Sequence, residues 1–141
     1  MTEARFLNLR AESAEDLPPL SALVQDMALM AGDVGYDARA RRLVIIGNRF
    51  RWEAPDPPTR VRSLLRFEFI DRAQRRMWPA LGEEVFSLLA IEAEETEGGR
   101  AFLTLAFSGG PTLRLEAEVI DVTLVDLAGP WDAAATPRHE A

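Results

Sequence analysis

The middle of this chain gathers the side chains best suited to hold an anionic partner. Arginine binds phosphates and carboxylates through a planar set of N–H donors, and tryptophan is frequent at protein interfaces. Residues 39–76 hold 11 arginines against 4 acidic residues, so this segment carries a formal charge of +7 and the remainder −14. The candidate interaction surface comprises Arg41, Arg42, Arg49, Arg51, Arg62, Arg66, Arg75, Arg76 and Trp78. Such a surface would suit a protein partner or RNA.

The alternative role for these arginines is a set of ion pairs between neighbouring strands. Arg49 and Arg51 alternate with Phe50 and Trp52, which places the aromatic rings in the core and the guanidinium groups outside. We expect ion pairs for most of them, because a chain of net charge −7 repels a polyanion elsewhere on its surface. The predicted acidic partners are Glu92, Glu94, Glu116 and Glu118.

Two runs of carboxylates could in principle bind a hard cation or hydrolyse a glycosidic bond. On strands with apolar neighbours, such residues are more typical of a solvated face. Trp78 has two readings as well: it either contacts a partner or anchors its own segment on the core, and we expect the anchor. The two acidic runs are Glu92, Glu94, Glu95 and Glu97, and Glu116, Glu118 and Asp121.

The residue types that are absent limit the chemistry further. The chain contains no cysteine and no lysine, which excludes disulfides, thiolate zinc sites, cysteine nucleophiles and lysine Schiff bases. Its single histidine, His139, lies close to the chain end, where we expect disorder rather than a site. The sequence therefore predicts no catalytic residue, no metal site and no cofactor.

Length and composition predict one domain. The chain has 141 residues, of which 48% are hydrophobic and 28% charged, as in ordinary globular proteins. We expect a single globular domain over residues 1–131 and a disordered tail over 132–141. Neither a long apolar run nor a signal peptide is visible, so the predicted compartment is the cytoplasm.

The clearest structural signal is a hairpin over residues 101–119. Apolar residues alternate with polar ones on both arms, and Gly109-Gly110 lies between them. Glycine reaches the positive φ angles that tight hairpin turns require. Beyond Val119 the apolar residues move from odd to even positions, which predicts a bulge or corner there.

The rest of the chain predicts further strands and one helix. Helical spacing of leucines predicts a helix over about 16–26, with Pro18 and Pro19 in its first turn. We interpret residues 72–83 as irregular because they contain Trp78-Pro79 and Gly82, and we expect Trp131 to fold back onto the core. The predicted strands cover residues 6–9, 28–36, 42–53, 61–71 and 85–95, besides the hairpin and the segment after it.

These elements favour a mainly β (α+β) fold. The prediction is an antiparallel meander of about seven strands, curved into a sheet or small barrel, with one N-terminal helix. A split barrel like that of pleckstrin-homology domains is the alternative description, although the helix here comes early in the chain.

Several soft motifs resemble a family of small alphaproteobacterial proteins, about 140–150 residues long, that is known only as a domain of unknown function. The similarity spans about residues 7–131 and implies a bacterial origin but no activity. The motifs are Ser13-Ala14-Glu15-Asp16-Leu17, Gln25-Asp26, Asn48-Arg49-Phe50-Arg51-Trp52-Glu53, Leu88-Leu89-Ala90-Ile91, and Leu113-Arg114-Leu115-Glu116 through Asp126-Leu127 and Trp131.

The sequence thus favours a non-catalytic binding or scaffold module of the bacterial cytoplasm. Its expected partner is an unidentified protein, and a homo-oligomer could form through a strand edge. The first alternative is a weak RNA-binding protein that uses the arginine-rich strand face. The second is an enzyme that uses carboxylates and a metal.

Overall fold

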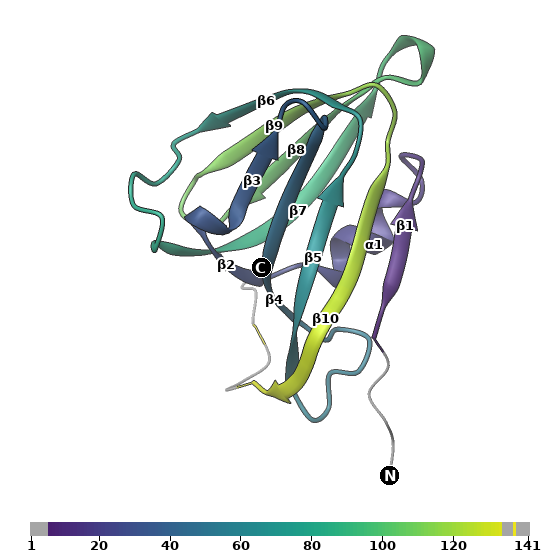
Figure 1. Ribbon diagram of the computed structural model, residues 1–141. Coiled ribbons are helices and arrows are strands. Elements are labelled where there is room, and N and C mark those ends of the chain that lie inside the picture. Colours follow the sequence, from purple (N-terminus) through teal and green to yellow (C-terminus); the bar gives the residue numbers. More distant parts are fainter. Residues whose placement is uncertain (1–5, 134–136, 138–141) are drawn as a thin grey trace.

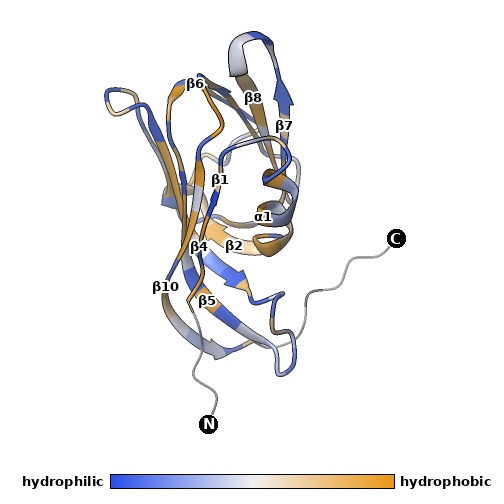
Figure 2. Ribbon diagram, turned by 90° about the vertical axis from the view of Figure 1, so that its right-hand side faces the viewer, coloured by the Kyte–Doolittle hydropathy of each residue, from blue (hydrophilic) through white to orange (hydrophobic). Residues whose placement is uncertain are grey.

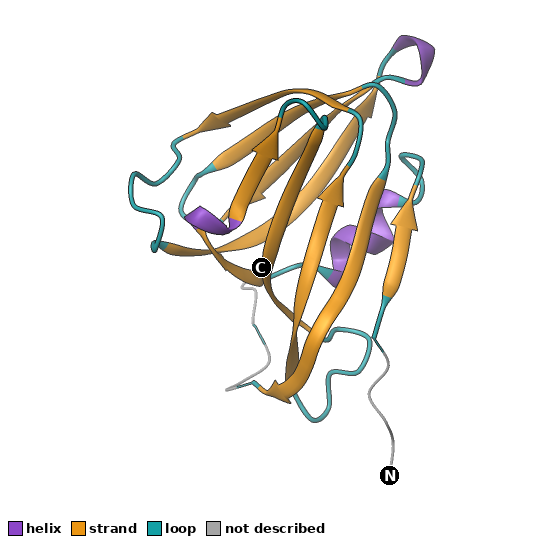
Figure 3. Cartoon of the chain, viewed as in Figure 1, coloured by secondary structure: helices purple, strands orange, loops and turns teal. Residues whose placement is uncertain are grey.

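The computed structural model describes residues 6–133 and Pro137, and its architecture is an antiparallel sheet with one α-helix (Figures 1 and 3). The elements are β1 (Asn8–Ala11), α1 (Leu17–Leu23), β2 (Met27–Met30), η1 (Ala31–Asp33), β3 (Val34–Asp37), β4 (Arg42–Phe50), β5 (Thr59–Phe67), β6 (Ile70–Arg76), β7 (Val85–Glu95), η2 (Glu97–Gly99), β8 (Ala101–Phe107), β9 (Thr112–Ala117) and β10 (Val122–Asp132).

The mainly β class with one helix is confirmed, but the sheet has ten strands rather than seven and is not a simple meander. Its order is β1-β10-β5-β4-β2-β7-β8-β9-β6, and β3 pairs with β4 outside this path. The sheet folds over at β2, so that β1, β10, β5 and β4 lie opposite β7, β8 and β9 (Figures 1 and 2). The two ends of the sheet, β1 and β6, do not pair with each other.

The fold-over at β2 depends on Gly47 of β4. A Cβ atom at this position would lie 2.6 Å from the carbonyl oxygen of Ala28 in β2, closer than any side chain tolerates. Glycine therefore lets the backbones of β2 and β4 approach closely where the sheet bends. The predicted hairpin turn is confirmed, since Gly109 and Gly110 have φ values of 85° and 106° between β8 and β9.

The core lies between the two halves of the sheet. Inward residues alternate along β8, β9 and β5, and the helix α1 buries Leu17 and Leu20 against the side next to β1 and β7. The predicted corner after Val119 is also confirmed: β9 pairs with β8 and β6, whereas β10 pairs with β5 and β1.

Four local predictions are wrong. The helix ends at Leu23 rather than near residue 26. The alternation over the strand expected at residues 61–71 would bury Phe69 beside Leu65 and Phe67, but Phe69 has a φ of 59° and is 39% exposed. Trp131 lies in β10 and is 41% exposed, rather than buried against the core.

The fourth error concerns the segment expected to be irregular. Its first part, up to Arg76, belongs to the strand β6, which pairs with β9 from Ile70↔Ala117 to Arg76↔Thr112. The predicted tail over 132–141, with His139, lies mainly outside the described residues. β6 is also the element on which the candidate site depends.

Candidate functional site

Arg49 lies inside the protein, so the prediction that it belongs to an exposed strand face is wrong. Its side chain has no exposed area, and its guanidinium group is held by two carboxylates. Nε and Nη2 donate to the Oδ atoms of Asp126, both at 2.8 Å. Nη1 and Nη2 donate to the Oε atoms of Glu53 at 2.8 and 2.7 Å. Nη1 also donates to the carbonyl of Phe50 at 3.3 Å. Arg49 thus forms a bidentate pair with each acid, and all five of its N–H donors are used within the chain.

The carboxylate of Asp126 joins four strands. Its Oδ1 accepts from the hydroxyl of Ser63 at 2.7 Å, and its Oδ2 accepts from the N–H of Leu7 at 2.8 Å. Arg49 comes from β4, Ser63 from β5 and Asp126 from β10, while Leu7 directly precedes β1. We call Arg49, Glu53, Ser63 and Asp126 the buried ion cluster. Its extent indicates that it fixes the register of these strands.

The ion cluster changes the acidity of its members. Burial alone would raise the pKa of Asp126, but the hydrogen bonds from Arg49, Leu7 and Ser63 outweigh it and hold this pKa below its ordinary value of 3.8. At Glu53, burial also raises the pKa, but the hydrogen bonds from Arg49 help to lower it, and the net effect is a pKa below the ordinary value of 4.5. Burial lowers and the two carboxylates raise the pKa of Arg49, with a net increase, so the arginine stays charged.

These directions predict how stability depends on pH. A carboxylate whose pKa is lower in the folded state stabilises the protein above its unfolded pKa, near 4. That contribution is lost as the pH falls through the folded pKa, so the free energy of unfolding should decrease from about pH 5 downwards. Urea unfolding between pH 7 and pH 2 measures this decrease. The Glu53→Gln variant should show a shallower decrease, and an equally steep one would contradict the role of Glu53.

Other arginines of the candidate surface are paired at the surface. Arg41 contacts Asp71 at 2.7 Å, Arg42 pairs with Glu68, and Arg66 approaches Glu68 at 3.3 Å. These pairs support the ion-pair interpretation for the outer face of β4 and β5.

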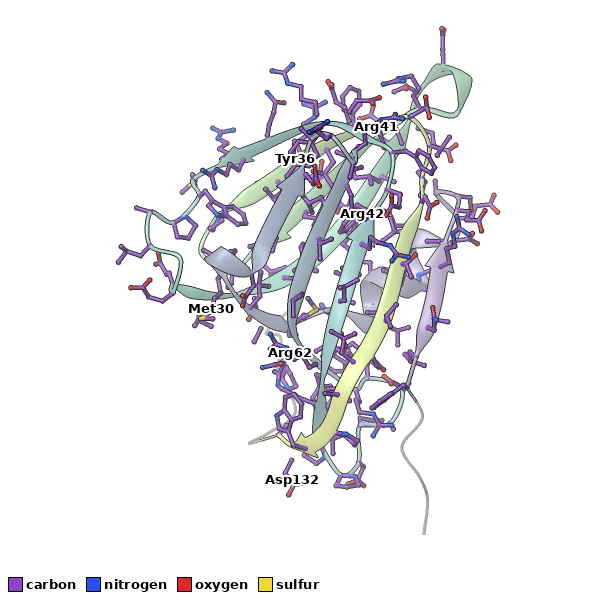
Figure 4. All side chains as sticks on the ribbon, viewed as in Figure 1. Met30, Tyr36, Arg41, Arg42, Arg62 and Asp132 are labelled. Carbon is purple, nitrogen blue, oxygen red and sulfur yellow. The ribbon has the colours of Figure 1, made fainter. Side chains whose placement is uncertain are left out.

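Arg51 and Arg62 are placed differently from those three. The Nε of Arg51 is 3.9 Å from Glu53, and its Nη1 donates to the hydroxyl of Thr59. Arg62 is exposed and forms no ion pair among the described residues. It lies on the same face as Arg42 but far along it (Figure 4).

The predicted acidic partners are mostly wrong. Within the described chain, Glu92, Glu94 and Glu116 form no ion pair with an arginine, although Glu116 lies opposite Arg72 in the β6–β9 ladder. Only Glu118 approaches an arginine, Arg41, at 3.6 Å. The reason is the fold: Glu92 and Glu94 lie on β7 and Glu116 on β9, in the half of the sheet opposite β4 and β5. The other acids that form ion pairs with arginines in the described chain are Glu12, Glu53, Glu68, Asp71, Asp121 and Asp126.

The strand β6 carries the largest unpaired positive charge. Arg72, Arg75 and Arg76 are all exposed, and none forms an ion pair with another described residue. A fourth unpaired arginine, Arg114, lies beside them on β9, where it pairs with Gln74 across the ladder. We call these four arginines the β6–β9 basic strip. Arg75 and Arg76 were part of the predicted surface, whereas Arg72 and Arg114 were missed.

A groove of about 720 Å³ lies along the β6–β9 basic strip. Arg75, Arg76 and Arg114 line one side of it, and Glu92 and Glu94 line the other. The floor includes Phe102, and the guanidinium carbon of Arg114 lies 4.3 Å from the centre of its ring. This cation–π contact holds Arg114 over the groove without neutralising its charge.

Trp78 anchors the segment that follows β6, as expected. Its ring packs edge-on against Phe86 and Phe107, with centroid distances of 5.2 and 5.4 Å. The indole is half-buried and also lines a small pocket between β3 and β6. The side chain thus supports the free side of β6 from within.

The described residues contain neither a group of metal ligands nor a membrane-spanning helix. In residues 6–133 and Pro137, no three histidine, cysteine, aspartate or glutamate side chains are grouped so that they could hold a metal ion. No helix in the same part of the chain is long and apolar enough to cross a membrane.

Comparison with known proteins identifies a family for this chain but no individual relative. No curated protein and no solved structure matches it. The profile of one family, described as "Protein of unknown function (DUF2948)", matches residues 7–139. This range includes the buried ion cluster, all of β6 and both sides of the groove. The chain therefore belongs to the DUF2948 family.

Proposed function

We propose that this protein is a non-catalytic binding module of the bacterial cytoplasm, and that the β6–β9 basic strip with its groove binds an acidic segment of a partner protein. The observation that carries the proposal is the contrast between paired and unpaired arginines. Arg41, Arg42, Arg49 and Arg66 each form an ion pair with a carboxylate of the chain. None of the arginines of the strip forms an ion pair with a described residue, although Arg72 lies opposite Glu116 in the ladder.

The charge of the whole chain makes this contrast informative. The protein has 23 acidic residues against 16 basic ones, so acids outnumber the arginines they could neutralise. Four arginines on two adjacent strands nevertheless form no ion pair with any residue that the structure describes. A local positive surface on an acidic protein attracts a negatively charged segment to that place and repels it elsewhere.

The aromatic residues that alternate with Arg49 and Arg51, and the one under Arg114, favour a protein partner over RNA. Recognition of single-stranded RNA relies on exposed aromatic faces that stack on bases. Phe50 and Trp52 pack on each other with centroids 4.6 Å apart, and the Nε1 of Trp52 donates to the carbonyl of Gln25. The face of Phe102 is covered by Arg114.

The test is a binding titration with defined probes. A fluorescein-labelled peptide, Glu-Val-Glu-Leu-Glu-Val-Glu, should bind the wild-type protein, and the same peptide with glutamines should bind much more weakly. The double variant Arg75→Gln/Arg76→Gln should weaken binding by about thirtyfold, because it removes two charge-assisted contacts that each contribute on the order of 1 kcal/mol. Fluorescence anisotropy at low salt gives the affinities.

A matched control removes the same charge elsewhere. The double variant Arg39→Gln/Arg62→Gln changes two exposed arginines outside the strip that have no described ion pair, and it should leave the affinity within about twofold. The function would be rejected if both double variants bound alike, or if no peptide bound at millimolar concentration. Tighter binding of a ten-nucleotide single-stranded RNA than of the peptide would favour the RNA alternative.

A further inference from the structure

We propose that β6 holds the partner by strand addition: an extended segment pairs with the free edge of β6, directs acidic side chains to the outer face and inserts an apolar side chain into the pocket between β3 and β6. This inference rests on the proposed function and specifies how the acidic segment is bound. Strand addition derives its affinity from backbone hydrogen bonds and its specificity from pockets for alternate side chains.

The first argument is that β6 has a free edge. It ends the strand order of the sheet and pairs only with β9. In an antiparallel strand, half of the backbone N–H and C=O groups point to each side, so β6 presents unpaired groups on its other side.

Among the described residues, hydrogen bonds to the backbone on that free side involve the first residue of β6 alone. The N–H of Ile70 donates to the carbonyl of Arg41 at 2.9 Å, and the hydroxyl of Tyr36 donates to the carbonyl of Ile70 at 3.1 Å. From Asp71 to Arg76, no backbone hydrogen bond from the described residues reaches this side. The free edge is therefore closed at one corner, near Tyr36 and Arg41 (Figure 4), and open along the rest of the strand.

The second argument is an apolar pocket beside the free edge. It has a volume of about 200 Å³ and is lined by residues of β3 and β6. A pocket of this size suits one large apolar side chain and not a whole chain segment. Its apolar lining consists of Val34, Tyr36, Leu43, Ala73, Trp78 and Leu113.

The third argument is that the two hollows lie on opposite faces of the same strand. Ala73 lines the apolar pocket, Arg76 lines the basic groove, and Gln74 and Arg75 border both. A segment added beside β6 alternates its side chains between these faces with the same period of two. The fitting partner sequence therefore alternates acidic and apolar residues.

The charges on β6 also exclude one obvious occupant, a second copy of this chain. Pairing β6 with β6 of another copy would set arginines against arginines, and like charges directly opposite each other destabilise a sheet. Basic side chains on an edge strand discourage such self-pairing. They favour an acidic segment for the same electrostatic reason.

The experiment uses peptides that differ only in which backbone edge is blocked. In the extended peptide Glu-Val-Glu-Leu-Glu-Val-Glu, the N–H groups of the glutamates point to one edge and those of the apolar residues to the other. One variant is N-methylated on the internal glutamates, and a second on the first valine and the leucine. Each carries two N-methyl groups and serves as the control for the other.

Strand addition predicts an unequal outcome. One methylated peptide should lose at least about tenfold in affinity for the wild-type protein, because it cannot donate to β6, while the other should stay within about twofold of the parent. Replacing the central leucine with alanine should weaken binding by about tenfold, because the pocket then buries less apolar area. Equal affinities of the two methylated peptides, whether both high or both low, would overturn strand addition.

The outcomes separate the inference from the function on which it rests. If the parent peptide binds and depends on Arg75 and Arg76, but the two methylated peptides bind equally, the basic strip is a binding surface that uses side chains alone. If the parent peptide does not bind at millimolar concentration, the proposed function fails and strand addition fails with it.

Discussion

Replacing Asp126 with alanine is expected to lower the free energy of unfolding by about 3–5 kcal/mol, the usual result of removing one partner from a buried ion pair. The side chain of Asp126 has no exposed area and accepts hydrogen bonds from Arg49, Ser63 and Leu7. Without it, Arg49 keeps only Glu53 as a counter-charge while its burial remains. Urea unfolding at pH 7 measures the change.

The control for this prediction is Asp121→Ala. Asp121 also forms an ion pair, at 2.6 Å, but its partner Arg10 is 56% exposed, so the loss should be about 1 kcal/mol or less. A variant that replaces Arg49 by methionine and Asp126 by leucine should recover part of the loss, because both fully buried charges are then removed together, while the remaining carboxylate of Glu53 is 25% exposed and can be solvated. Equal effects of Asp126→Ala and Asp121→Ala would contradict the special cost assigned to burial.

Phe67→Ala is the second substitution expected to have a large effect, also about 3–5 kcal/mol, because it removes a large side chain from a closed core. Phe67 is fully buried on β5, with Leu43 of β4 directly opposite on one side and Val122 of β10 on the other. Leu43 and Val122 belong to the two strands that flank β5, and the backbone pairing on both sides limits how far they can move into the cavity. The midpoint of urea unfolding should fall accordingly.

Phe102→Ala provides the comparison. Phe102 is half-buried on the outer face of β8, where Arg114 covers its ring. Its loss removes a cation–π contact and partly exposed apolar area, which corresponds to about 1 kcal/mol. If Phe67→Ala were no more destabilising than Phe102→Ala, the two faces of the sheet would be assigned the wrong way round.

The sequence predicted the strands whose apolar residues alternate, and it failed where they do not. β8 and β9 alternate along their whole length around two glycines, so hairpin and turn were both visible. β6 has only Ile70 and Ala73 as apolar residues, and it is a strand because β9 offers it a partner distant in the sequence. Local pattern carries no signal for such a pairing.

The buried ion cluster was missed for a different reason. Phe50 and Trp52 suggested that the even positions of this segment face the core, which would place Arg49 outside. The strand as a whole shows the opposite: Leu43, Ile45 and Arg49 share one buried face. The sequence did contain a signal, because each polar residue lies two positions from a buried apolar residue and therefore on the same face of its strand. Ser63 shares the buried face of Leu65, and Asp126 shares the buried face of Leu124. When polar residues occupy positions on the apolar face of three different strands, they indicate a polar layer inside the core.

The most direct test of binding at β6 is a map of where the acidic peptide contacts the protein. Titrating the ¹⁵N-labelled protein with Glu-Val-Glu-Leu-Glu-Val-Glu, and following the backbone amide signals by NMR, locates the contact residue by residue. If the peptide adds to the free edge of β6, the largest shifts will occur at Arg72, Ala73, Gln74, Arg75 and Arg76, with smaller shifts on β9 and β3. Shifts centred on the outer face of β4 and β5, around Arg42 and Arg62, would contradict it.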